Sequence, residues 1–247
     1  MTASDGFLSQ ISPKQLDNPS IRGRRPQVWI LYPQVRTVCP SNLYQRSRTS
    51  NVSSQNSVSP YFFNAGLLST GPILETLASA YAFTIIDAIS SSSIPPFDVL
   101  FGPAYKGIPI AACTALVLHT SHNMSVGLAY DRKELKDHGE GGRLVGVSVK
   151  GKRVVILDDV MTAGTAVRLA IELVRREGGN VVGVVQCLDR EEVGQSGVST
   201  VNEVEGIVGT GAVKSILKMR DLMEWLKENE KVAELESMHK YRESWSS

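Results

Sequence analysis

The stretch VVILDDVMTAGTA, residues 154–166, decides the fold that this sequence predicts. Four branched apolar residues in a row are typical of a buried strand, and two adjacent aspartates end that strand. Small and hydroxyl-bearing residues then lead into TAVRLAIELVRREG, residues 165–178, whose apolar positions follow helical spacing. A buried strand that turns at once into a helix is typical of an α/β protein with a parallel sheet.

Strands and helices alternate on both sides of this stretch. Several of the strands are unbroken runs of Val, Ile and Leu, which indicates a sheet covered by helices on both faces. The expected elements are a helix over 70–90 behind a Thr70 cap, a strand at 97–102, a helix over 108–119, strands at 125–130, 143–149 and 181–189, and a tail with a strand and charged helices over about 220–243. The predicted fold is therefore α/β, with a central, mainly parallel sheet flanked by helices.

Composition excludes several classes of function. The chain has 247 residues, 42% of them hydrophobic, which is enough for the core of one large domain. Lys and Arg number 26 against 25 for Asp and Glu, so there is no general electrostatic reason to bind nucleic acid or a membrane. We also see no apolar stretch that approaches the roughly 18–20 residues of a membrane span. We therefore expect no nucleic-acid partner and no membrane partner.

The cysteines and histidines predict neither a disulfide nor a protein-bound metal. Cys39, Cys113 and Cys187 lie far apart, which suits a reducing compartment, and a cytoplasmic location is expected. His119, His122 and His239 do not combine with a carboxylate or a cysteine at metal-ligand spacing.

Residues 1–58 differ from the rest of the chain. They are rich in Ser, Asn, Pro and Arg, with seven basic residues against two acidic ones. We expect a disordered leader here and the folded domain over 59–247. An organelle transit peptide is the alternative, but prolines at 13, 19, 26, 33 and 40 break any long amphipathic helix.

The paired aspartates predict a sugar-phosphate site. At the ligand-binding edge of a parallel sheet, Asp158 and Asp159 can accept hydrogen bonds from sugar hydroxyls or help hold Mg²⁺ through water. The small residues that follow let backbone N–H groups close on a phosphate, and Thr162 and Thr165 add hydroxyl donors. The alternative is that the aspartates only cap the next helix. A Walker A sequence is absent, which argues against nucleotide triphosphate hydrolysis.

This motif resembles the binding signature for activated ribose in the type I phosphoribosyltransferases. The resemblance implies that family's fold and contacts with 5-phospho-α-ribosyl 1-diphosphate (PRPP). The residues that it assigns to PRPP in this motif are Asp158, Asp159, Val160, Met161, Thr162, Ala163, Gly164, Thr165 and Ala166.

A second segment, residues 131–143, is interpreted as a flexible lid. Between Tyr130 and Leu144 the only aliphatic side chain is Leu135, so the segment has almost nothing to bury. Its cations, Arg132, Lys133, Lys136 and His138, are suited to neutralise a departing diphosphate. The alternative is a solvated charged hairpin loop.

The lid sequence, with KDHGEGG, resembles the catalytic loop of orotate phosphoribosyltransferases. That loop reaches into the active site of the neighbouring subunit, so the resemblance implies a homodimer with shared sites. It also implies catalytic roles for Lys136 and His138, together with Asp159.

Three shorter segments resemble the same family. FGPAYKG, residues 101–107, resembles its diphosphate-binding loop and assigns Tyr105 and Lys106 to PRPP. The orotate-binding residues that the resemblance implies are Phe62 and Phe63 of SPYFFNAG, Thr162, and Arg190 of CLDRE, the last on the orotate carboxylate. Taken one at a time, these residues also fit ordinary core or surface positions.

The resemblance implies an enzyme that converts orotate and PRPP to orotidine 5′-phosphate and diphosphate, with Mg²⁺ carried by PRPP, in pyrimidine synthesis. One position departs from the pattern. The family has an LKSGR-like strand before SPYFF, and its lysine falls on Ser54 here. This departure leaves open a non-catalytic PRPP-binding regulator or inactive homologue, and a purine phosphoribosyltransferase is a further alternative.

Overall fold

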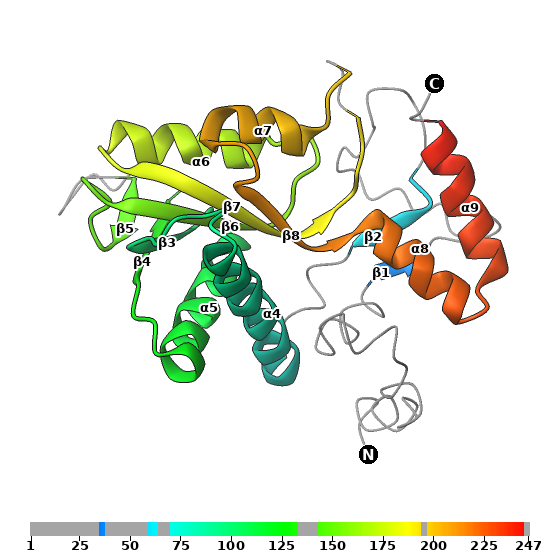
Figure 1. The fold of residues 1–247 in the computed structure, drawn as a ribbon, viewed down its shortest axis with the longest axis horizontal. Coiled ribbons are helices and arrows are strands. Elements are labelled where there is room, and N and C mark those ends of the chain that lie inside the picture. The colour runs from blue at the N-terminus through cyan, green and yellow to red at the C-terminus, as the bar shows by residue number, and fades with distance from the viewer. Residues whose placement is uncertain (1–34, 38–58, 64–69, 133–142, 194–196, 245–247) are drawn as a thin grey trace.

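The central sheet has the predicted, mainly parallel arrangement (Figure 1). The computed structural model describes residues 35–37, 59–63, 70–132, 143–193 and 197–244. Within these ranges six strands pair in the order β5-β4-β3-β6-β7-β8, and only the β4–β5 pair is antiparallel. The strands are β3 Val99–Gly102, β4 Gly127–Asp131, β5 Leu144–Gly146, β6 Arg153–Val160, β7 Asn180–Asp189 and β8 Val213–Lys218.

Helices cover both faces of the sheet, as expected from the apolar strands (Figure 1). One face packs against α4 Gly71–Ser90 and α5 Gly107–His122, and the other against α6 Thr165–Arg176 and α7 Thr200–Val208. Strand β6 packs against the helices on both faces of the sheet, because successive side chains of a strand point to opposite faces. Val155 and Leu157 belong to the cluster with α4 and α5, and Val154 and Ile156 to the cluster with α6. This double burial explains why β6 is apolar at consecutive positions.

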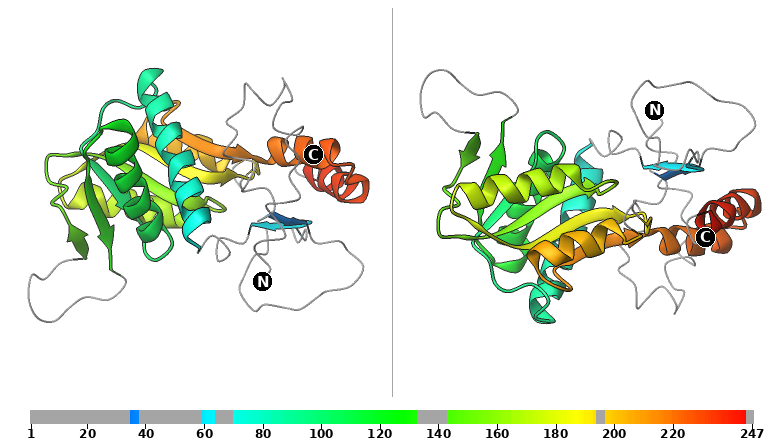
Figure 2. Two further views of the ribbon diagram at one scale, coloured as in Figure 1. Left: turned by 90° about the horizontal axis from the view of Figure 1, so that it is seen from below. Right: turned by 90° about the horizontal axis from the view of Figure 1, so that it is seen from above.

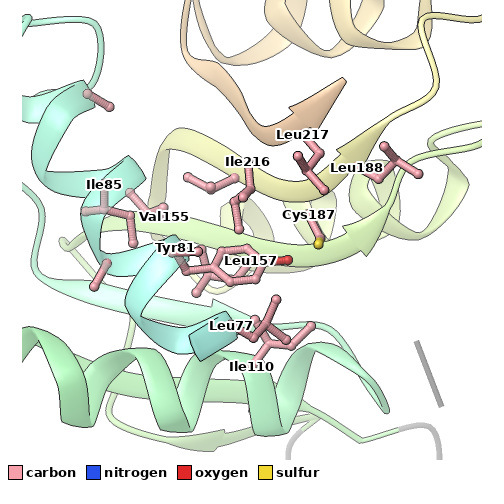
Figure 3. Packing of buried hydrophobic residues seen from close by; sticks show 14 of the residues in the cluster. Leu77, Tyr81, Ile85, Ile110, Val155, Leu157, Cys187, Leu188, Ile216 and Leu217 are labelled. Carbon is pink, nitrogen blue, oxygen red and sulfur yellow. The ribbon is translucent and has the colours of Figure 1, made fainter. Parts of the chain in front are cut away.

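Helix α4 corrects the expectation that no stretch approaches the length of a membrane span. Its 20 residues are long and apolar enough to cross a bilayer, judged by length and composition alone. Eight of them are buried inside the protein, and the helix packs against α5, β7 and β8. Figure 3 shows Leu77, Tyr81 and Ile85 of α4 directed at the sheet residues Val155 and Leu157. The helix is therefore apolar because it lies in the core.

The C-terminal helices lie beyond one end of the sheet. Strand β8 leads directly into α8 Met219–Glu228, and α9 Val232–Glu243 follows (Figure 2). Beside these helices, β1 Val35–Thr37 pairs antiparallel with β2 Tyr61–Phe63. Strand β1 lies within residues 1–58, the predicted leader, whose disorder stays a prediction. The remainder of 1–58 lies outside the described residues.

Two further elements differ from the sequence prediction. Strand β5 ends at Gly146, although the apolar pattern continues to Val149, because Gly146 has φ +101° and cannot continue a regular strand. Helix α7 was not predicted from the sequence. Only Val204 of this helix is fully buried, so its apolar stripe is too narrow to give a strong periodic signal.

Candidate active site

The two aspartates lie where β6 leaves the sheet. Asp158 is 8% exposed and Asp159 is partly exposed. Asp158 Oδ1 accepts a hydrogen bond from the Asp159 N–H, and Asp159 Oδ1 accepts one from the Val160 N–H, both at 2.9 Å. In each aspartate, Oδ1 is therefore bound within its own turn, and Oδ2 can bind other partners.

A tyrosine from α4 fixes the backbone at this point. The Tyr81 hydroxyl donates a hydrogen bond of 2.6 Å to the carbonyl oxygen of Asp158. Figure 3 places the Tyr81 ring beside Leu157, and the residue is fully buried. Burial raises the pKa of Tyr81 well above its usual range, so its hydroxyl remains a donor at physiological pH.

A buried glutamine ties the end of β6 to the next two strands. Gln186 of β7 is fully buried, and its Oε1 accepts a 2.9 Å hydrogen bond from the Met161 N–H. Its Nε2 donates to Ser215 Oγ of β8 at 3.1 Å. Because an unpaired buried amide is costly, this pair of contacts holds Met161 at the start of the small-residue loop.

The loop between β6 and α6 is held from its outer side. Thr200 Oγ1 donates to the Thr162 carbonyl at 2.8 Å, and Arg168 Nη2 donates to the Ala163 carbonyl. Arg168 is in turn paired with Glu203 at 3.0 Å. These contacts engage loop carbonyls, while the first N–H groups of α6 have no partners within the helix. The arrangement suits the predicted phosphate site.

Gly164 is required by the shape of this loop. It has φ +68° and precedes the first residue of α6. A Cβ there would lie 2.7 Å from Thr200 Cγ2. Thr162 and Thr165 on either side are exposed, as a ligand-binding role requires.

The predicted diphosphate loop reaches the same edge of the sheet. It follows β3, and Lys106 Nζ lies 2.7 Å from Asp159 Oδ2. The close approach depends on Gly107, where a Cβ would lie 2.9 Å from the Leu157 carbonyl oxygen. Tyr105 is exposed beside Lys106. The structure thus brings together the sequence-predicted Lys106 and Asp159, which are separated by 53 positions.

The electrostatics of the Asp158 carboxyl differ from those of a free carboxylate. Burial, and then the negative charge of Asp159, raises the pKa of the Asp158 carboxyl above its ordinary value. Across the described parts of the chain, no group of three or more His, Cys, Asp or Glu is placed to hold a metal by itself. A metal here would need ligands from a substrate as well, and paired carboxylate oxygens are suitable partners for Mg²⁺ with phosphates.

The base of the predicted lid is described, but its centre is not. Strands β4 and β5 pair Asp131 with Leu144, and the Arg132 N–H donates to the Arg143 carbonyl at 2.8 Å. Asp131 Oδ1 also accepts a 2.6 Å hydrogen bond from the Ala104 N–H, which links the lid base to the diphosphate loop. The predicted residues Lys133, Lys136 and His138 lie outside the described residues.

The predicted base site lies at the end of the neighbouring strand, β7. Arg190 is bound there by protein groups: its Nε donates to Tyr61 at 3.2 Å, and its Nη2 pairs with Glu192 at 2.6 Å. Of Phe62 and Phe63 the structure describes only the backbone, on β2, where Phe62 is opposite Arg36. Ser54, the position of the family's lysine, lies outside the described residues.

Comparisons with known proteins agree with this geometry. Residues 70–200 match the phosphoribosyl transferase domain family. The orotate phosphoribosyltransferase of Acinetobacter baumannii is 46% identical over 188 residues, which cover 76% of this chain and 84% of that protein. The chain belongs to the orotate phosphoribosyltransferase family.

Two further members of the orotate phosphoribosyltransferase family support this assignment. The enzyme of Shewanella oneidensis is 47% identical over 189 residues, covering 76% of this chain and 85% of that protein. The crystal structure of the Francisella tularensis enzyme matches with a TM-score of 0.68 and 30% identity, covering 88% of this chain and 96% of that one. Both the fold class and the family predicted from the sequence are confirmed.

Several residues that shape the site were not singled out from the sequence. They are Ser59, Tyr61, Tyr81, Arg168, Gln186, Glu192, Thr200 and Tyr241. Tyr81 falls within the predicted helix over 70–90, and Gln186 within the predicted strand at 181–189. An uncharged polar side chain within an apolar run was the one signal available for Gln186.

Proposed function

We propose that this protein transfers the 5-phosphoribosyl group of PRPP to orotate and releases diphosphate. The product is orotidine 5′-phosphate, a step of pyrimidine synthesis. The observation that carries the proposal is the edge of the sheet where Asp158 and Asp159, the loop before α6, and Lys106 meet. This edge combines diol acceptors, a phosphate cradle and a cation, which are the three groups that PRPP requires.

In this proposal the end of β6 binds the sugar phosphate. The Oδ2 atoms of Asp158 and Asp159 accept hydrogen bonds from the ribose hydroxyls once Lys106 leaves Asp159 for the diphosphate, and the backbone of residues 162–166 binds the 5-phosphate. Thr200 and Arg168 support the binding of the phosphate by holding loop carbonyls on the far side. This arrangement fixes the ribose before the reaction, which lowers the entropic part of the barrier.

The leaving group is stabilised by cations. As orotate attacks the anomeric carbon, the bond to diphosphate breaks and its electron pair stays on the diphosphate, through an oxocarbenium-like state. Tyr105, Lys106 and Arg132 contact this group at the sheet edge, and Lys133, Lys136 and His138 of the lid complete its neutralisation. Lys106 is 63% exposed in its pair with Asp159, so the pair is weak and a substrate phosphate can replace the carboxylate.

Mg²⁺ is the cofactor that the proposal requires. Bound with PRPP, it would supply positive charge to the diphosphate. The oxygens of Asp158 and Asp159 that are not bound to their own turn fit this ion, directly or through water. Orotate is placed by Phe62, Phe63, Thr162 and Arg190.

The proposal extends to assembly and location. A homodimer with shared sites is the assembly in which the lid of one subunit serves its partner. A reducing cytoplasm suits Cys113 and Cys187, which are both free thiols. A regulator without turnover is not favoured, because the aligned regions cover most of this chain and most of the enzymes named above.

The test is orotate consumption by the full chain, followed by the loss of orotate absorbance. We expect turnover only when PRPP and Mg²⁺ are both present, and none with adenine or guanine in place of orotate. Lys136→Ala is expected to lower turnover about a hundredfold, since it removes a cation from the developing charge. Lys150→Ala, an exposed lysine between β5 and β6, is the control. Wild-type protein that binds PRPP but consumes no orotate would overturn the proposal.

A further inference from the structure

Arg190 lies at a junction of three distant segments. It follows β7, and its side chain is 14% exposed. Its Nη2 donates to Ser59 Oγ at 3.0 Å, beside β2, and to the Tyr241 hydroxyl of α9 at 3.1 Å. Its guanidinium carbon lies 5.1 Å from the centre of the Tyr61 ring. Helix α9, at the far end of the chain, therefore contacts the residue expected to bind the base.

Tyr241 connects the two charged groups of this junction. Its hydroxyl accepts from Arg190 and donates to Glu192 Oε1 at 2.7 Å, while Glu192 pairs with Arg190 at 2.6 Å. The three side chains thus form a closed triangle. Burial, and then the hydrogen bond to Glu192, raises the pKa of Tyr241 to about 12, so its hydroxyl keeps its proton at neutral pH.

The protein contacts of Arg190 determine which edge of its guanidinium group remains for a ligand. The Tyr61 hydroxyl engages Nε, and three partners share the two N–H groups of Nη2. Within the described parts of the chain, no hydrogen bond uses Nη1. A carboxylate that binds Arg190 is thus directed to the Nη1 side, and a two-pronged contact must also share Nη2.

We propose that Tyr241 is a positioning residue for base binding. Glu192 holds the Tyr241 hydroxyl in place, and Tyr241 orients the Arg190 guanidinium toward the carboxylate of the base. Helix α9 thereby forms part of the base site. This inference rests on the proposed function, because it concerns how the same site selects a carboxylate-bearing base. The packing of Tyr241 favours a fixed orientation, since it is 5% exposed and its ring meets that of Tyr61 edge-on, with centroids 6.3 Å apart.

The first experiment is the kinetic analysis of Tyr241→Phe. This change keeps the ring and removes only the hydroxyl. We expect KM for orotate to rise about tenfold, because the Arg190 guanidinium loses the hydrogen bond that Tyr241 accepts from it. KM for PRPP and the melting temperature should stay close to wild type. Lys240→Ala, at an exposed neighbouring position on α9, is the matched control and should change neither KM.

The second experiment is a double-mutant cycle with Arg190→Lys. If Tyr241 acts through the guanidinium, adding Tyr241→Phe to Arg190→Lys changes KM for orotate by less than about twofold. Additive effects would overturn the inference, as would an unchanged KM for orotate in the single Tyr241→Phe variant. Equal increases in both KM values with a lower melting temperature would assign Tyr241 a purely structural role and also overturn it. Failure of the wild type to consume orotate would instead refute the proposed function itself.

Discussion

The carboxyl ends of β6 and β7 are neighbours in one sheet, but they are built in opposite ways. At β6, one continuous segment supplies both aspartates, the loop and the start of α6. At β7, one residue, Arg190, is held by groups that are 131, 129 and 51 positions away in the sequence. The first site can be recognised from a short motif. The second exists only after the chain has folded.

The two ends also differ in how firmly their charges are held. The Lys106 side chain is 63% exposed in its ion pair with Asp159, so solvent weakens that pair. The Arg190 and Glu192 side chains are 14% and 17% exposed, and both also bind Tyr241. A shielded network in which each side chain has several hydrogen bonds is rigid. We therefore expect the β6 end to rearrange on substrate binding and the β7 end to remain as it is.

The largest expected effect is that variants at the β6 end impair the use of PRPP, whereas variants at the β7 end impair the use of orotate. Asp159→Asn should lower kcat/KM for PRPP on the order of a hundredfold, because it removes a charged acceptor. Arg190→Lys should mainly raise KM for orotate, about tenfold, because lysine cannot make a forked contact. Initial rates with each substrate varied in turn measure both. If each variant changed the kinetic constants for both substrates to the same extent, the assignment of PRPP to the β6 end and of orotate to the β7 end would be wrong.

A smaller effect is expected from Gly164→Ala, which tests whether PRPP binding depends on the backbone conformation of the loop after β6. Gly164→Ala should destabilise the protein by about 1 kcal/mol, because φ +68° strains an alanine, and should raise KM for PRPP about tenfold. Gly151→Ala is the control: Gly151 has φ +69° and nothing within 4 Å of an added Cβ. It shares the backbone strain but not the contact with Thr200, so it should lose less stability in urea denaturation, with KM for PRPP unchanged. A tenfold rise for both variants would contradict a local role of Gly164.

A further effect concerns the dependence of stability on pH. Because the pKa of Asp158 is raised in the folded protein, the native state binds more protons than the unfolded state between the ordinary and the raised pKa. The free energy of unfolding should therefore fall as pH rises through this window. Asp158→Asn should abolish that fall, as measured by urea denaturation at a series of pH values.

Asp98→Asn provides the contrast for this measurement. Hydrogen bonds from Arg153, first from its backbone N–H, lower the pKa of Asp98. Asp98 therefore contributes stability above its ordinary pKa, and that contribution is lost as the pH falls. The two variants should change the pH profile in opposite directions. Profiles that change in the same direction would refute the assignment of the raised pKa to Asp158.

Local patterns were sufficient to predict the sheet and the β6 end. The apolar run before Asp158 and the helical spacing after Thr165 are signals within one segment, and the structure places β6 and α6 there. Tyr241 and Thr200 have no such signal, because their contacts depend on how α9 and α7 pack against the rest of the protein. Residues 133–142 lie outside the described residues, so the roles of Lys136 and His138 stay predictions.

The short outer strand of the sheet has a consequence for assembly. Strand β5 contributes three residues and ends at a glycine with φ +101°. An open strand edge can act as a template on which another chain adds a strand, and a three-residue edge offers few backbone groups for such growth. Uncontrolled edge-to-edge association is therefore disfavoured on this side of the molecule.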